Sequence, residues 1–143
     1  MTPFEYISTK IFVKLKPSRI QGVGVFAIRD IPLQINPFEV WSGDTGLYSI
    51  SEYELLLLPK ELYDHIKDIF LYGPNFPSDS STYVKLIRGC HWIYTTPYYF
   101  INSGFDKFNI DKNTLLTNRV IYKGEELLSN YGRFERFNKK DLL

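Results

Sequence analysis

The chain has 143 residues, of which 44% are hydrophobic and 17% aromatic, and its formal net charge is +1. This length suits a single domain with one core, and the small net charge gives no argument for a nucleic-acid or membrane partner. One cysteine, Cys90, excludes an internal disulfide, and with only His65 and His91 beside it no closed structural zinc site can form. We therefore expect no metal.

The first half of the chain predicts two short strands and then a helix. Apolar and polar residues alternate over 10–15, and Pro17 ends this run, whereas residues 25–28 form a second β-prone run. Ser51 and Glu54 have the spacing of a capping box, in which a hydroxyl and a carboxylate satisfy free backbone N–H groups at a helix start. A helical insertion is therefore expected over residues 51–72, interrupted at Pro59.

The second half predicts a loop followed by further strands. Residues 74–81 are rich in Pro, Ser, Asn and Asp, which favour turns. β-branched and aromatic residues then return in short runs, which predict strands over 83–87, 91–94, 98–101 and 114–120. The sequence thus predicts a mainly β domain with a helical insertion.

The segment Gly22-Val23-Gly24 admits more than one interpretation. It fits the glycine spacing of a dinucleotide-binding fingerprint, but that motif requires a long helix directly after the glycines, and Pro32 stops the chain too soon. A glycine turn or bulge between two strands is the simpler interpretation. A third interpretation is a turn whose missing Cβ atoms let a ligand approach the backbone.

Two separated blocks together resemble the SET domain, the family of S-adenosylmethionine-dependent protein lysine methyltransferases. The first runs from Ser18 to Ile31 and contains the two glycines, and the second is Gly124-Glu-Glu-Leu-Leu-Ser-Asn-Tyr-Gly132. Phe100-Ile-Asn-Ser103 lies between them in the family's order, although the usual Asn-His-Ser-Cys is altered here. The resemblance implies a SET-like β-clip fold over residues 10–132, with a knotted threading of the Tyr131 segment and a tail at 133–143, all in one domain.

The resemblance also implies the site residues. Gly22, Val23, Gly24, Asn102 and Ser103 would hold S-adenosylmethionine, and Tyr131 would be the catalytic tyrosine. An ordinary Asn-Ser-Gly turn and a core tyrosine remain the alternatives for the last two motifs.

Aromatic residues near these motifs are expected to complete the site. Tyr98 and Tyr99 are candidates for the walls of a lysine channel, with Phe137, and Phe134 would cover the cofactor. Tyr98 and Tyr99 could instead be ordinary core aromatics, and the tail could pack Phe137 on the core or be disordered beyond Lys139.

The function implied by the resemblance is methyl transfer from S-adenosylmethionine to a lysine of a protein or peptide. The alternative is a degenerate SET-like module that binds a partner without catalysis. The N-terminal residues lack the pattern of a signal peptide, so a cytoplasmic protein is expected, or a nuclear one if the substrate is chromatin. A homodimer is left open.

Overall fold

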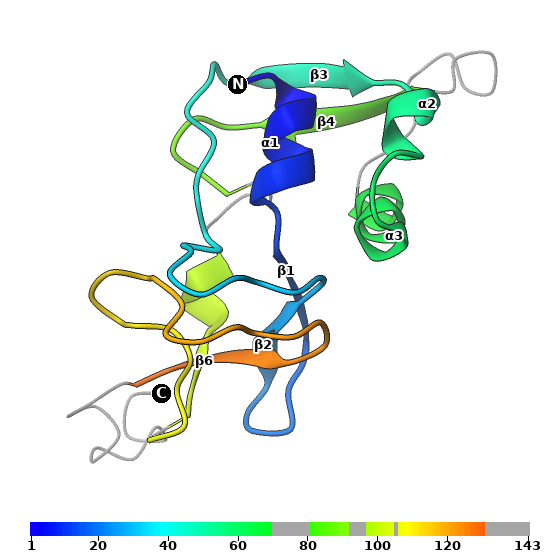
Figure 1. The fold of residues 1–143 in the computed structure, drawn as a ribbon. Coiled ribbons are helices and arrows are strands. Elements are labelled where there is room, and N and C mark those ends of the chain that lie inside the picture. Colours follow the sequence, from blue (N-terminus) through cyan, green and yellow to red (C-terminus); the bar gives the residue numbers. More distant parts are fainter. Residues whose placement is uncertain (70–80, 92–96, 105, 131–143) are drawn as a thin grey trace. The chain divides into compact units, whose positions relative to one another are not determined.

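The computed structural model describes residues 1–69, 81–91, 97–104 and 106–130. These residues form a mixed α/β structure with more strand than helix, so the predicted strand-rich fold is confirmed in part (Figure 1). The chain divides into two compact units, the first comprising residues 1–11 and 38–96 and the second residues 12–37 and 97–143. Each unit has its own sheet.

The first unit begins with a helix that was not predicted, α1 (Pro3–Lys10). The Thr2 hydroxyl accepts a hydrogen bond from the Glu5 backbone N–H at 3.0 Å, and the Glu5 carboxylate accepts one from the Thr2 N–H at 3.3 Å. Pro3 suits the first helical turn, where its missing N–H leaves no donor lost. These features are a capping box, the same signal that predicted the later helix at Ser51.

The predicted helical insertion is confirmed within the described residues as two helices, α2 (Glu52–Leu55) and α3 (Lys60–Ile69). Ser51 caps α2, because its hydroxyl accepts a hydrogen bond from the Glu54 N–H at 3.2 Å. In the sequence these helices separate two strands, β3 (Gly46–Ile50) and β4 (Thr82–Leu86), which pair with each other in the antiparallel direction. The sequence predicted β4 one residue too late and did not predict β3.

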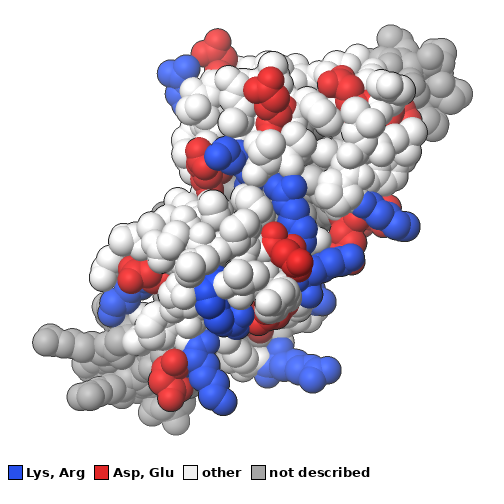
Figure 2. Space-filling model, in the orientation of Figure 1, with Lys and Arg blue, Asp and Glu red and all other residues white. Residues whose placement is uncertain are grey.

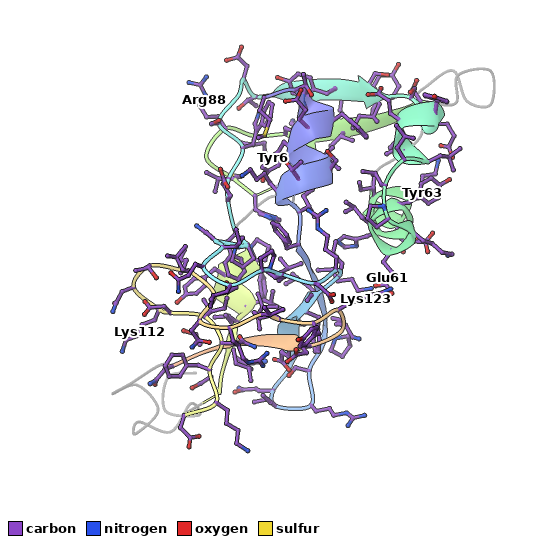
Figure 3. The ribbon with its side chains drawn as sticks, viewed as in Figure 1. Tyr6, Glu61, Tyr63, Arg88, Lys112 and Lys123 are labelled. Carbon is purple, nitrogen blue, oxygen red and sulfur yellow. The ribbon has the colours of Figure 1, made fainter. Side chains whose placement is uncertain are left out.

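Aromatic packing dominates one part of the core of this unit. Tyr6 points from α1 (Figure 3), and its hydroxyl donates to the Glu39 carbonyl at 2.7 Å. The Tyr6 ring lies 5.4 Å from that of Trp41 and 6.5 Å from that of His91, between centroids. Burial, and secondly the positive charge of a protonated His65, lower the pKa of His91 to about 3. The imidazole of His91 is therefore neutral at physiological pH.

The second unit is built on a four-stranded sheet in the order β1-β2-β6-β5. β1 (Val13–Pro17) and β2 (Val23–Ala27) form an antiparallel hairpin, and β6 (Glu126–Ser129) is antiparallel to β2 (Figure 1). β5 (Asn102–Ser103) adds to the other side of β6 in the parallel direction. β6 thus lies between two segments that are remote from each other in the sequence. The buried face of the sheet carries apolar residues from three strands, among them Val13, Val25, Ala27 and Leu127.

Several predicted strands in this unit are wrong or shifted. β1 starts three residues after the predicted run and includes Pro17, which is compatible with an edge strand. Residues 97–100 form a 3-10 helix, η1 (Pro97–Phe100), in place of most of the strand predicted at 98–101. Residues 114–120 form no strand and make a single bridge, at Thr117; directly before them the Asp111 carboxylate accepts backbone hydrogen bonds from Asn113 and Thr114 and fixes a turn. In the first unit, the strand predicted at 91–94 lies largely outside the described residues.

Charged side chains of both signs are interspersed on the visible face (Figure 2), so no broad field of one sign appears there. None of the helices in the described part of the chain combines the length and apolar character needed to cross a bilayer.

Candidate functional site

The turn between β1 and β2 brings the glycine segment close to Ser18. The Ser18 backbone N–H donates to the Gly22 carbonyl at 2.7 Å, and the Ser18 hydroxyl accepts from the Ile20 N–H at 3.0 Å. Gly22 has a φ of +49°, in the left-handed region that favours glycine. The interpretation of this segment as a glycine turn between two strands is therefore confirmed. Among the described residues, no other group lies within 4 Å of where a Gly22 Cβ would be, so they leave one side of this backbone open.

Glu126 lies directly against the second glycine. In β6, Glu126 is paired with Phe26, two residues after Gly24 on the same face of β2. A Cβ on Gly24 would be only 2.4 Å from Glu126 Oε2 and 3.0 Å from the Ser18 Cβ. Real Cβ atoms do not approach other atoms this closely. Glycine at position 24 therefore lets a carboxylate lie over the backbone of β2.

Asn102 completes this polar cluster from a third segment. The parallel pairing of β5 with β6 sets Asn102 opposite Leu128, on the face that also carries Glu126. Its amide nitrogen donates to Glu126 Oε2 at 2.9 Å and to the Gln21 carbonyl at 3.1 Å, and the Val23 carbonyl lies at 3.4 Å. The side chain is buried, with 5% exposed. One amide thus ties the glycine turn to β6.

The carboxylate of Glu126 is held by neutral donors. The Ser18 hydroxyl lies 2.8 Å from Oε1 and 3.0 Å from Oε2, and the Asn102 amide supplies the remaining hydrogen bond. Within the described ranges no lysine, arginine or histidine forms an ion pair with Glu126. The adjacent Glu125 differs, because Arg119 pairs with it at 2.7 Å and lowers its pKa.

The structure brings together some, but not all, of the residues predicted for the site. Gly22, Gly24 and Asn102 meet as described, and Val23 takes part through its carbonyl group, while its side chain is 45% exposed. Ser103 is buried and stands opposite Ser129 in the β5–β6 pair. The remaining predictions concern aromatic residues, of which Tyr98 is half-buried in η1, while the side chain of Tyr99 and all of Tyr131, Phe134 and Phe137 lie outside the described residues.

The altered motif after Asn102 has a packing reason. Gly104 donates its N–H to the Ser129 carbonyl at 2.8 Å, and a Cβ there would meet the Leu128 side chain at 2.9 Å and the Lys107 carbonyl at 3.1 Å. Glycine thus allows the chain to leave β5 while staying close to β6. Asn102 and Ser103 form a short strand, so the simple turn predicted as the alternative for Asn-Ser-Gly is not what these two residues adopt.

Sequence reasoning missed two members of the cluster, Ser18 and Glu126. Both lie inside the blocks that carried the family resemblance, but neither was assigned a role. Alternation along β6 gave a signal, since Glu126 and Leu128 share one face while Leu127 and Ser129 point to the buried one. A carboxylate on a strand in the middle of a domain needs hydrogen-bond donors, and Ser18 is one of them.

The cluster offers a hydrogen-bond acceptor and an accessible stretch of backbone to a ligand. Asn102 Oδ1 receives no hydrogen bond from the described residues, because the amide nitrogen faces the acceptors, and it therefore offers an acceptor to a ligand. The open side of Gly22 lets a ligand approach the backbone. No three metal-binding side chains gather among the described residues.

No protein-family model and no curated protein sequence matches this chain. Among solved structures, one that is similar is a candidate histone methyltransferase of Plasmodium falciparum. The two chains are 21% identical with a TM-score of 0.34, and the match covers 86% of this chain and 95% of the other. At that TM-score the likeness is distant.

Proposed function

We propose that this chain is a protein lysine methyltransferase that uses S-adenosylmethionine. The observation that carries the proposal is the meeting of the three motif segments at Asn102, whose amide binds the carbonyl of Gln21 beside Gly22 and the carboxylate of Glu126. These segments are separated by 81 and 24 positions in the chain, yet they share one polar cluster. They stand in the order and with the polarity of the SET family.

An ordinary glycine turn between two strands would not need a hydrogen bond from a distant segment such as that of Asn102. Two-strand turns are closed by local hydrogen bonds, as Ser18 and Gly22 already do here. Burying an amide from a distant segment costs desolvation free energy unless the amide is hydrogen-bonded. An additional role for Asn102, as a ligand for a zwitterion, gives a reason for its position.

The proposed chemistry asks the protein mainly to hold and orient its reactants. When bound, S-adenosylmethionine would supply an activated methyl group on its sulfonium. The amine nitrogen would bond to the methyl carbon in line with the C–S bond, which breaks, and S-adenosylhomocysteine would leave. The chain's residues would fix the cofactor's amino-acid end through Asn102 and the glycine backbone, so that the methyl group keeps one direction. Correct orientation of this kind accounts for large rate enhancements without any metal.

The substrate lysine must be neutral to attack. Its ordinary pKa of about 10.4 makes deprotonation at neutral pH cost about 4 kcal/mol. A water-poor channel and the nearby sulfonium would both lower that pKa, by desolvation and by like charge. In this proposal the Tyr131 hydroxyl orients the amine.

Calorimetric titration of the purified chain with S-adenosylmethionine and with its product S-adenosylhomocysteine tests the cofactor. We expect both to bind and to raise the thermal unfolding temperature. A folded protein that shows neither heat nor a thermal shift at millimolar cofactor would contradict the proposal. It would favour the alternative, a SET-like module that binds a protein partner without catalysis.

The catalytic step is tested separately with Tyr131→Phe. We expect cofactor affinity to change little and single-turnover methyl transfer to lysine peptides to fall by one to a few orders of magnitude, roughly 1.5 to 4 kcal/mol in the barrier. Tyr53→Phe is a matched control, because the Tyr53 ring is 78% exposed in the first unit. Wild-type rates in Tyr131→Phe would show that Tyr131 is not in the site.

A further inference from the structure

The carboxylate of Glu126 is a half-buried negative charge that the described residues hold but do not neutralise. Its hydrogen bonds come from the Ser18 hydroxyl and the Asn102 amide, both of them uncharged. A carboxylate in a partly desolvated place is stabilised most by a positively charged donor. The cluster therefore has the electrostatic character of a site for a small cation.

The amide of Asn102 can stand in only one orientation. Its three neighbours on the nitrogen side are the Glu126 carboxylate and the carbonyls of Gln21 and Val23, and all of them can only accept hydrogen bonds. The NH₂ group must face them, so Oδ1 is the atom of the amide that is left to accept a hydrogen bond from a ligand. Glu126 thus determines that Asn102 presents an acceptor, and not a donor, to a ligand.

The backbone next to this pair is shaped by the missing side chain of Gly24. The carboxylate occupies the space where a Cβ would stand, at 2.4 Å from it. Ser18, which accepts the Ile20 N–H, fixes the same carboxylate from the turn side. Charge and acceptor are therefore held in place before a ligand arrives, which reduces the ordering cost of binding.

We propose that Glu126, together with Asn102 Oδ1, forms the seat for the ammonium group of the cofactor's amino-acid end. This rests on the proposed function, and it assigns to Glu126 the selection of ligands that carry that ammonium. Glu126 supplies the opposite charge and orients Asn102, which accepts a hydrogen bond from the same group. An ammonium has three donors, which suits a carboxylate and an amide oxygen side by side.

The test compares two ligands that differ only in the ammonium. S-adenosylhomocysteine carries it, and the deaminated analogue keeps the adenosine, the thioether and the carboxylate. By calorimetry we expect wild type to bind S-adenosylhomocysteine at least about thirtyfold more tightly than the analogue, as a charge-assisted hydrogen bond provides. Glu126→Gln should reduce this ratio about tenfold or more, mainly through weaker binding of S-adenosylhomocysteine.

Glu125→Gln is the matched control, since it changes the neighbouring carboxylate, which Arg119 already pairs. We expect its affinity ratio to equal that of wild type. A merely structural role for Glu126 would weaken both ligands equally and leave the ratio unchanged, which would overturn the inference. Equal binding of the two ligands by wild type would also overturn it, while the proposed function would stand.

Failure of the proposed function has a different signature, because wild type would then bind neither ligand, and the inference would fall with it. If Glu126→Gln does not fold, Ser18→Ala replaces it, since that variant keeps the charge and removes only the hydroxyl that fixes it. We then expect the ratio to fall about threefold. An unchanged ratio in folded Ser18→Ala would overturn the inference.

Discussion

Two carboxylate clusters, one in each unit, are built from similar parts but differ in charge. In the first unit Glu52 of α2 accepts hydrogen bonds from the Tyr63 hydroxyl at 2.5 Å and from the Lys67 ammonium at 3.1 Å, and both donors belong to α3. The Tyr63 hydroxyl, and secondly Lys67, lower the pKa of Glu52. In the second unit Glu126 has the hydroxyl and the amide but no cation among the described residues.

The difference separates a structural cluster from a candidate binding site. A carboxylate that is paired with lysine ties two helices together and leaves no net charge to attract a ligand. A carboxylate held by neutral donors keeps its charge, which a cationic ligand can satisfy. His91 of the first unit likewise presents no net charge to a ligand, because burial keeps its imidazole neutral.

The largest expected effect comes from filling the space over the second glycine. Gly24→Val should weaken the binding of S-adenosylhomocysteine about a hundredfold and destabilise the fold by about 1 to 3 kcal/mol, because the new side chain displaces the Glu126 carboxylate. Calorimetry and thermal unfolding measure the two effects. Gly46→Ala is a control, since the nearest atoms to a Cβ there belong to the Tyr48 side chain, at 3.6 Å, which is an ordinary van der Waals contact. Unchanged affinity in folded Gly24→Val would contradict the assignment of the Glu126 cluster as the binding site.

The buried imidazole of the first unit should make stability depend on pH. The pKa of His91 is about 3 in the folded chain against 6.5 for the ordinary group, so the unfolded chain binds more protons between these values. The contribution is complete above about pH 6.5 and is lost as the pH falls, by about 1.5 kcal/mol between pH 6.5 and 5.

Chemical denaturation at several pH values measures this loss. His91→Leu, which cannot be protonated, should show a flatter pH dependence than wild type in that range, whatever its absolute stability. Equal slopes would show that His91 is not kept neutral in the folded state.

A smaller effect on stability is expected at Glu52, the carboxylate that pairs with Lys67. Glu52→Gln should lower the free energy of unfolding by about 1 kcal/mol, because a charged acceptor for Tyr63 and Lys67 is lost. The lowered pKa means that this contribution is present above the ordinary carboxyl pKa and disappears as the pH falls through the folded one. Ligand affinity should stay at the wild-type value. Weaker binding in Glu52→Gln would show that the two clusters are not functionally separate.

The smallest effect is expected at the exposed pair of the second unit. Arg119→Met should cost about 0.5 kcal/mol or less, because water already screens this ion pair with Glu125. The Arg119 side chain is 48% exposed and that of Glu125 33%. Denaturant unfolding measures the change in the free energy of unfolding. A loss above about 2 kcal/mol would show that the Arg119–Glu125 pair is structurally important, so that Glu125→Gln is not a neutral control for Glu126→Gln.

Local signals in the sequence predicted what depends on neighbouring residues. The cap at Ser51, the helices after it and the turn at Gly22 follow from side-chain spacing and backbone freedom, and the structure has all of them. α1 carried an equally local capping signal at Thr2, but it went unnoticed. The strands predicted at 98–101 and 114–120 failed because β-prone composition does not decide whether a partner strand is within reach.

What the sequence by itself determined about this protein is the set of motifs: the glycine turn, the Asn102 segment and the Glu-rich block that leads into β6, each readable from a few adjacent residues. Only the tertiary structure decided that they meet at one carboxylate. Hydrogen bonds across 81, 108 and 24 positions depend on the strand order β1-β2-β6-β5, which no local preference encodes. Glu126 owes its place to pairing between strands, whereas Glu125, one residue earlier, faces Arg119 and the solvent.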